Sequence, residues 1–230
     1  MEDGHFVSLV GPSGSGKSSL LRAVIGLQQP LAGTVETGLA PSDIVILFQD
    51  DALLPWKTAR DNVALGLTFR GLPRYQALAD AELWLDRLGL AGFGSRFPRL
   101  LSGGQRKRVA LAQVLALNPK LLLMDEPFAS LDAIVRARIV RDVAQLVERD
   151  RITVLLVTHD LEEAISLSDT VYLLSQGPRA RILHEYQVAI PRPRDPMRAR
   201  THPAFAALYD RLWSDLSQEV DRMPRAEAAA

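Results

Sequence analysis

The sequence predicts an α/β fold in which a mainly parallel sheet is flanked by helices. Three observations support this: short apolar runs alternate with helical stretches, a glycine-rich turn joins the first run to the first helix, and a long helical stretch separates the second run from the third. Strands of a parallel sheet are covered on both faces and read as continuous apolar runs, and helices make the crossovers between them. The 230 residues suffice for one domain with a subdomain.

The first strand is expected at Phe6 to Val10, directly before the glycine-rich turn. Apolar residues from Leu20 to Ile25 recur at helical spacing, so a helix should follow the turn. We expect this helix to close at Gln28-Gln29-Pro30, because proline disfavours helical geometry in the residue before it. A second buried strand is expected at Ile44 to Phe48.

Residues from about 58 to 100 alternate amphipathic stretches with glycine and proline breaks, which indicates a helical subdomain inserted between strands. Trp84, in this region, is expected to be a core residue rather than a ligand. A helix from about Gln105 to Leu117 follows a Ser-Gly-Gly turn. The chain then continues through a strand at Leu121 to Met124, an amphipathic helix, and a strand at Thr153 to Val157. The alanine-rich end, residues 226–230, is expected to be disordered.

Composition excludes several classes of protein. Lysine and arginine balance aspartate and glutamate, and cysteine is absent, so disulfides and thiolate metal sites are ruled out. No apolar run approaches the roughly 18 residues that span a bilayer, and the first residues do not resemble a signal peptide. The arginine-rich stretch from Arg179 to Arg200 lacks interleaved aromatic residues, so we expect a solvated or protein-facing loop and no nucleic-acid partner.

A phosphate-binding loop pattern lies between the first strand and the first helix, where its chemistry requires it. Its residues are Gly11, Pro12, Ser13, Gly14, Ser15, Gly16, Lys17 and Ser18. The glycines let backbone N–H groups turn toward phosphate oxygens, and the helix start adds its positive dipole end. Lys17 would neutralise the β and γ phosphates, and the Ser18 hydroxyl would ligate Mg²⁺. A chance glycine- and serine-rich turn is the alternative.

Two adjacent carboxylates, Asp125 and Glu126, follow the apolar run that begins at Leu121. They stand at the carboxyl end of a buried strand, the edge at which α/β sheets bind ligands. Asp125 is suited to hold the Mg²⁺ shell, and Glu126 to polarise an attacking water. A plain exit from strand to turn is the alternative, but the phosphate loop would supply the metal that these acids serve.

A second serine- and glycine-rich turn, Leu101-Ser102-Gly103-Gly104-Gln105, opens the next helix. Arg106, Lys107 and Arg108 crowd its first turn, where the helix dipole disfavours cations. An anion or an acidic neighbour would offset this cost. On electrostatics alone, we expect these long side chains to extend into solvent.

Together these residues resemble the ordered motif set of ABC-type ATPase domains, a class of phosphate-loop NTPases. The set consists of Gly11 to Ser19, Gln49, Leu101 to Gln105, Leu121 to Pro127, Ser130-Leu131-Asp132 and His159. The resemblance covers residues 4 to about 175. It implies one ABC ATPase domain over residues 1–230, with a helical subdomain at about 58–117 that includes the Ser102 turn and a C-terminal extension at about 178–225.

The resemblance implies a role for each matching residue. Gln49 resembles the glutamine that touches Mg²⁺ and the attacking water and senses a transmembrane partner. Glu126 would be the catalytic base, and His159 resembles the switch histidine bonded to the γ-phosphate. Asp132 would lie in the segment that crosses a dimer interface and, with the other three, is assigned to the catalytic set.

The implied mechanism is ATP-driven association of two subunits. Ser102, Gly103, Gly104 and Gln105 form the signature turn, which contacts ATP held by the Lys17 loop of a second copy or of a related ATPase subunit. Binding closes this dimer and hydrolysis lets it open, so the site is complete only on closure. The resemblance further implies that the ATPase drives a transmembrane permease and is bound to it at the cytoplasmic face of the inner or plasma membrane. A solute-binding protein would be an indirect partner.

A narrower resemblance points to the nitrate, sulfonate and taurine branch of bacterial importers. It is carried by Phe48 to Trp56, Ala59 to Val63, Met124 to Ala133 and Ile190 to Arg194. In that setting, Leu53 to Trp56 would lie beside the groove that receives the membrane subunit's coupling helix. Core packing is the alternative for Trp56.

The sequence departs from the family near its start. The extra strand and the aromatic residue that stacks on adenine do not fit into the ten residues before Gly11, and the connection from Leu31 to Ser42 is short. Either the N-terminus is truncated or mis-started, or adenine is held without that stack. We therefore expect an apparently truncated N-terminal antiparallel β subdomain and weakened nucleotide binding.

Three other functions share the same engine. The alternatives are an exporter or lipid-extraction ATPase, a DNA-maintenance or ribosome-acting ATPase, and a degenerate ATPase that binds without turnover. The single phosphate loop and the short interval from Lys17 to Ser102 argue against the second, and intact Lys17, Glu126 and His159 argue against the third.

Overall fold

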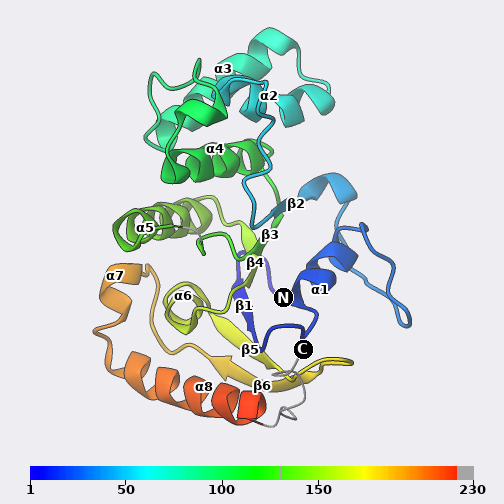
Figure 1. Ribbon diagram of the computed structural model, residues 1–230, viewed down its shortest axis with the longest axis vertical. Coiled ribbons are helices and arrows are strands. Elements are labelled where there is room, and N and C mark those ends of the chain that lie inside the picture. The colour runs from blue at the N-terminus through cyan, green and yellow to red at the C-terminus, as the bar shows by residue number, and fades with distance from the viewer. Residues whose placement is uncertain (130, 222–230) are drawn as a thin grey trace, which may run out of the picture.

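The computed structural model describes residues 1–129 and 131–221. Within these residues, six strands form one sheet in the order β2-β3-β4-β1-β5-β6 (Figure 1). Five strands are parallel and β6 pairs antiparallel with β5. The strands are β1 (Phe6–Val10), β2 (Ile44–Leu47), β3 (Leu121–Asp125), β4 (Thr153–Val157), β5 (Thr170–Leu174) and β6 (Ile182–Gln187). The predicted mainly parallel α/β fold is confirmed.

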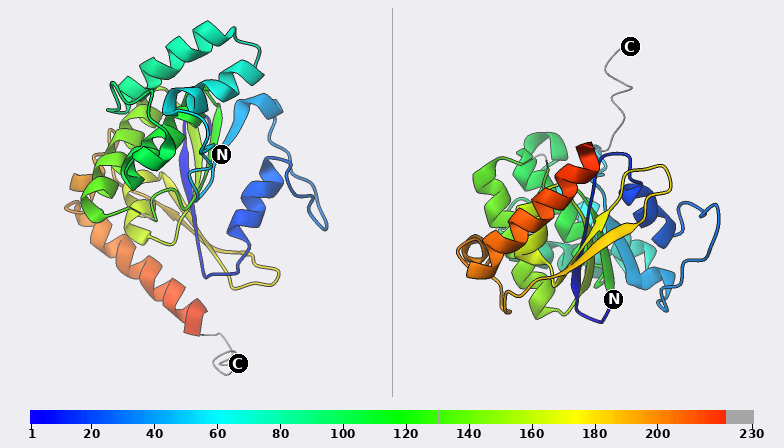
Figure 2. Two further views of the ribbon diagram at one scale, coloured as in Figure 1. Left: turned by 45° about the horizontal axis from the view of Figure 1, so that its top comes forward. Right: turned by 90° about the horizontal axis from the view of Figure 1, so that it is seen from below.

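Helices cover both faces of this sheet and extend beyond one end of it (Figures 1 and 2). Helix α1 lies on one face, α5 to α8 lie on the other, and α2 to α4 form the upper part of the molecule in Figure 1. The helices are α1 (Lys17–Val24), α2 (Ala59–Phe69), α3 (Arg74–Arg87), α4 (Gly103–Leu115), α5 (Ala133–Arg149), α6 (Leu161–Leu167), α7 (Pro196–Ala199) and α8 (Pro203–Asp221), with 3₁₀ turns at Pro41–Asp43 and Pro98–Leu100.

Alternation along β1 explains how the two faces are filled. Leu9 packs in a cluster with Leu21 of α1. Phe6 and Val10 point to the opposite face, where their clusters include α5 and α6 respectively. All five residues of β1 are buried, as expected for a strand with parallel neighbours on both sides and helices on both faces. Trp84 packs against the cluster of Phe6, in agreement with the expected core role.

Helix α1 ends earlier than the sequence predicted. It stops at Val24, not at residues 28–30. Gly26 adopts a left-handed conformation with φ of +79°, and the N–H of Leu27 donates to the carbonyl of Arg22 at 2.8 Å. A glycine in this conformation terminates a helix without the steric penalty that other residues carry. The helix therefore ends before Gly26, upstream of Pro30.

Helix α4 is displaced by two residues from its predicted position. It runs from Gly103 to Leu115 because Ser102 caps its start. The Ser102 hydroxyl accepts the N–H of Gln105, and the Gln105 side chain accepts the N–H of Ser102. This reciprocal pair satisfies two backbone donors that a helix start leaves free. The glycines of the signature turn are thus inside the helix.

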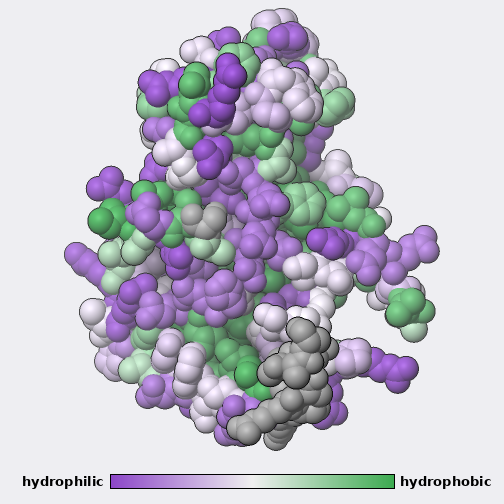
Figure 3. Space-filling view, in the orientation of Figure 1, coloured by the Kyte–Doolittle hydropathy of each residue, from purple (hydrophilic) through white to green (hydrophobic). Residues whose placement is uncertain are grey.

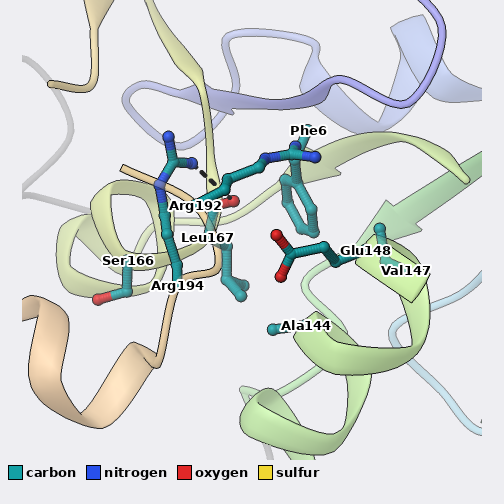
Figure 4. Close-up of a pocket in the computed structure, with 8 residues that line it drawn as sticks. All are labelled: Phe6, Ala144, Val147, Glu148, Ser166, Leu167, Arg192 and Arg194. Atoms are coloured by element: carbon teal, nitrogen blue, oxygen red, sulfur yellow. Dashed lines mark hydrogen bonds between the residues drawn. The ribbon is translucent and has the colours of Figure 1, made fainter. Parts of the chain in front are cut away.

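The segment after β6 is tied to the body of the molecule through arginine. Arg192 and Arg194 both pair with Asp169, and the Arg194 side chain is only 8% exposed. In Figure 4 the two arginines lie beside Phe6 and Glu148, and Arg194 also donates to the carbonyl of Leu167. Part of the arginine-rich stretch is therefore protein-facing.

Two expectations fall outside the described residues: the placement of Ser130 and the disorder of residues 226–230. None of the helices in the described part of the chain has the length and apolar content needed to cross a membrane. On the face seen in Figure 3, hydrophilic side chains run across the middle of the molecule.

Candidate functional site

Four neighbouring parallel strands bring the predicted site residues to one edge of the sheet. Gln49 lies two residues after β2, Asp125 ends β3, His159 lies two residues after β4, and Gly11 directly follows β1. These strands are adjacent in the order β2-β3-β4-β1, so their carboxyl ends lie together. This is the edge at which open α/β sheets bind their ligands.

The phosphate loop is folded around the Lys17 side chain. Lys17 begins α1, and Gly16 before it has a φ of +86°, which favours glycine. The Lys17 ammonium donates to the carbonyls of Gly11 and Pro12, each at 2.8 Å, and to the Ser15 hydroxyl at 3.2 Å. The loop therefore holds a buried cation at its centre.

The electrostatics of this cation set it apart from a surface lysine. Burial lowers the pKa of Lys17, and the carboxylates of Glu126 and Asp125 act in the opposite direction. A buried ammonium is costly unless anions or acceptors surround it. A phosphate group bound at the loop would add a negative charge close to this ammonium.

The residues expected to hold Mg²⁺ are partly assembled. The Ser18 hydroxyl donates to Oδ1 of Asp125 at 2.9 Å, so a hydroxyl and a carboxylate oxygen share one position beside the loop. Oxygen ligands of this kind suit Mg²⁺, which keeps several waters and usually takes few protein ligands. Among the described residues no group of three or more His, Cys, Asp or Glu could bind a metal ion alone. The donor set fits an ion that also takes oxygen ligands from phosphate.

Glu126 is held in a conformation that glutamate seldom adopts. Its φ is +44°, and its N–H donates to the carbonyl of Val157 at the end of β4. Its carboxylate lies 3.1 Å from Nδ1 of His159, a contact that is ionic when the imidazole is protonated. Strained backbone persists where surrounding structure enforces it, often at functional sites. Glu126 thus combines this uncommon backbone conformation with a carboxylate beside His159.

The signature turn lies apart from the phosphate loop of its own chain. Helix α4, which begins beyond Ser102, belongs to the upper part of the molecule in Figure 1, whereas α1 lies lower against the sheet. Gly104 instead approaches the start of α5, where a Cβ on it would lie 2.4 Å from Cγ1 of Val135. Asp132 is exposed and caps α5 by accepting the N–H of Val135 at 3.0 Å.

The cations after the signature turn are paired, and the expectation that they extend into solvent is wrong for Lys107 and Arg108, whereas the Arg106 side chain is 41% exposed. Lys107 is 1% exposed, and its ammonium lies 2.9 Å from Oδ1 of Asp51. Arg106 also pairs with Asp51, and Arg108 pairs with Asp142 of α5. Acidic neighbours from other elements offset the unfavourable dipole. The sequence showed that three adjacent cations at a helix start are unfavourable, but not which acidic residues would offset them.

Gln49 is linked to this cluster through its backbone. Lys107 donates to the Gln49 carbonyl at 2.9 Å. The side chain of Gln49 is exposed at the strand edge, and its expected contact with Mg²⁺ and water remains a prediction. Sequence reasoning missed both Lys107 and Asp51.

The segment after Gln49 is fastened by a buried asparagine and leaves a tryptophan exposed. The Asn62 side chain accepts the N–H of Leu54 and donates to the carbonyls of Leu54, Lys57 and Thr58. Trp56, within this loop, is 70% exposed. Core packing is therefore the wrong explanation for Trp56.

The loop after β5 supports the phosphate loop from behind. A Cβ on Gly177 would lie 2.4 Å from the carbonyl oxygen of Gly14, so only glycine permits this approach. No motif in the sequence marked Gly177, because the contact depends on how β5 and β1 are paired.

The fold and this sheet edge define a phosphate-loop cassette of the α/β class. The family model described as "ABC transporter" matches residues 1–129. The chain belongs to the ABC transporter family.

Curated relatives and a solved structure are similar over most of the chain. The aliphatic sulfonates import ATP-binding protein SsuB of Burkholderia pseudomallei is 45% identical over 99% of this chain and 66% of its own length. The bicarbonate transport ATP-binding protein CmpC of Synechococcus elongatus is 39% identical over 95% of this chain. The chain spans only 34% of the length of CmpC. The expected resemblance to this importer branch is confirmed.

The solved structure is the ATP-binding cassette MJ0796, described as a dimer in a post-hydrolysis state bound to ADP and Pi. It is 32% identical to this chain with a TM-score of 0.72, and the match covers 83% of this chain and 88% of that one. The expected cassette fold is confirmed.

Proposed function

We propose that the chain is the ATP-binding and ATP-hydrolysing subunit of an ABC importer and powers solute uptake through a separate permease. The observation that carries the proposal is the joint placement of the Lys17 loop, the Ser18–Asp125 pair and the Glu126–His159 pair at one sheet edge. The names of the relatives favour import over the exporter and non-transport alternatives.

Each residue contributes a distinct part of the chemistry. The Lys17 ammonium and the loop N–H groups grip the β and γ phosphates. Ser18, Asp125 and Gln49 would hold Mg²⁺, which when bound offsets the negative charge that builds up on the phosphates. Glu126 accepts a hydrogen bond from the attacking water and orients it in line with the γ-phosphate, and His159 fixes the Glu126 carboxylate.

The second half of the site would come from another subunit. Because the signature turn lies apart from Lys17 in its own chain, a second copy or a related subunit would present Ser102, Gly103, Gly104 and Gln105 to the bound ATP, with Asp132 nearby. The dimeric cassette MJ0796 supports this arrangement. Exposed Trp56 would face the permease, which would hold the chain at the cytoplasmic side of the membrane and indirectly couple it to a solute-binding protein.

Substitution Glu126→Gln tests the proposed chemistry. We expect ATP hydrolysis to fall by about a hundredfold or more, since a lost general base typically costs that much, while ATP binding is retained. Phosphate release and ATP titration measure the two quantities. Hydrolysis at the parental rate in the variant, or no hydrolysis by the parent with its permease, would contradict the proposal.

A further inference from the structure

The most deeply buried cation among the described residues lies between two parts of the proposed site. Lys107 is among the largest of the fully buried side chains, yet it carries a charge. Its ammonium bonds to the Gln49 carbonyl at 2.9 Å and to Asp51 at 2.9 Å. Burying an ammonium is unfavourable unless such partners compensate for lost water. The position of Lys107 therefore depends on residues 49–51 staying in place, and theirs on Lys107.

Lys107 lies in the same helix as the glycines of the signature turn. It lies in α4, five residues after the Ser102 cap, and the capping pair with Gln105 fixes the first turn of that helix. A capped helix moves as a unit over this distance. Displacing residues 49–51 would then displace Ser102, unless the buried ion pair broke.

The opposite end of this loop has a different anchor. Asn62 of α2 holds the backbone of Leu54, Lys57 and Thr58. Trp56, the exposed side chain expected to meet the permease, lies within the stretch that Asn62 holds. Displacement of residues 54–58 can reach α4 through α2, which packs against it, whereas residues 49–51 are joined to α4 directly by the Lys107 ammonium.

We propose that Lys107 is a positioning residue that makes the Gln49 loop and the Ser102 turn move together, so that loop displacement reaches both halves of the ATP site. The inference rests on the proposed ATPase function and deepens it. Lys107 acts through its bond to the Gln49 carbonyl and through its place in α4.

Three variants separate coupling from mere stability. Lys107→Met removes the buried cation and leaves Asp51 paired only with Arg106, whose side chain is 41% exposed. The pair Lys107→Met with Asp51→Leu removes both charges, and replacing a buried ion pair by apolar residues often restores stability. Arg108→Met is the matched control, since it removes a neighbouring cation of α4 that bonds to the Leu88 carbonyl and Asp142 rather than to the Gln49 loop.

The first measurement is hydrogen exchange without nucleotide, which needs no ATPase activity. We expect backbone amides of residues 49–54 to exchange faster in Lys107→Met and in the double variant, and to keep the parental rate in Arg108→Met. Parental exchange of residues 49–54 in both Lys107 variants would overturn the inference, whatever the outcome for hydrolysis.

The second measurement determines kcat and the Kd for ATP separately in the double variant. We expect an unfolding temperature close to the parent's, an unchanged Kd for ATP, and a kcat lower by about tenfold or more, the usual effect of losing a residue that supports a metal ligand. A kcat that recovers along with stability would mean that Lys107 is only structural. Absence of hydrolysis in the parent would count against the proposed function and leave the exchange result to decide the inference.

Discussion

At the scale of single residues, the site is built from side chains whose ordinary chemistry is altered by burial. Lys17, Lys107 and Glu163 are all buried and ionisable. Lys17 and Lys107 have compensating acceptors at the proposed site. Glu163 is different, because burial raises its pKa to about 7, with the Asp160 carboxylate adding to the effect and Thr158, Arg136 and His159 opposing it.

Glu163 should make stability depend on pH. Its folded-state pKa lies above its ordinary value of 4.5, so the folded form holds the proton more tightly. The resulting stabilisation is fully present below pH 4.5 and is lost as pH rises through about 7. One pKa unit corresponds to about 1.4 kcal/mol, so the loss is on the order of 3 kcal/mol. Thermal unfolding of the parent and of Glu163→Gln between pH 5 and 8 measures it.

The Gln side chain can still accept the hydrogen bond that Thr158 donates to Glu163 at 3.0 Å. We therefore expect the variant to lose less stability than the parent over this range and to be the more stable protein at pH 8. Parallel pH profiles for the two proteins would contradict this prediction.

At the scale of elements, the starts of α4 and α5 pack against each other through glycine. Sequence reasoning assigned Gly103 and Gly104 to nucleotide contact alone. The structure separates them: a Cβ on Gly104 would meet Val135 at 2.4 Å, whereas a Cβ on Gly103 would have Arg106 at 3.8 Å as its nearest neighbour. Gly104 therefore also sets how closely the signature turn approaches the segment that carries Asp132.

Substitution Gly104→Ala should destabilise the protein although alanine favours helices. The gain from helix propensity is at most about 1 kcal/mol, while overpacking costs about 1 to 3 kcal/mol. A β-branched valine in a helix has few rotamers with which to yield. We expect a net loss of about 1 to 2 kcal/mol in urea unfolding.

Two companion variants make this test specific. Gly103→Ala has room for its methyl group and should leave stability unchanged or slightly higher. Adding Val135→Ala to Gly104→Ala should recover much of the loss. A Gly104→Ala protein as stable as the parent would show that α4 and α5 can separate at no cost.

At the scale of the whole molecule, the residues of the proposed ATP site lie in two separate regions of the chain. The phosphate loop belongs to the sheet, while the signature turn belongs to the group of α2, α3 and α4 (Figure 1). On the proposed function, completing the site requires a second subunit, and a nucleotide that cannot be hydrolysed should trap the pair.

Glu126→Gln with MgATP should sediment at twice the monomer mass. Without nucleotide it should remain a monomer, because no phosphate then bridges Lys17 of one copy to Ser102 of the other. Adding Ser102→Arg should abolish the ATP-dependent species, while ATP binding by the monomer persists. A monomer at saturating MgATP in Glu126→Gln would contradict the shared site.

The amino-acid order by itself determined the α/β class, the phosphate loop and the strand-end carboxylates, because these depend on local pattern and on chemistry that adjacent residues supply. Strands β1 and β4 matched their predicted bounds, since buried strands are marked by uninterrupted apolar runs. Helix boundaries were less predictable. Gly26 ends α1 several residues before Pro30, and the Ser102 cap starts α4 two residues before the position that periodicity predicted.

Only the tertiary structure decided which distant groups meet. Lys107 with Asp51, Gly177 against Gly14, and Gly104 against Val135 all join segments far apart in sequence. Such contacts depend on strand order and helix packing, which no local pattern encodes. The Lys107 ammonium is the example. Considered within its own helix it was expected to be solvated, but it is buried because the segment after β2 places Asp51 beside it.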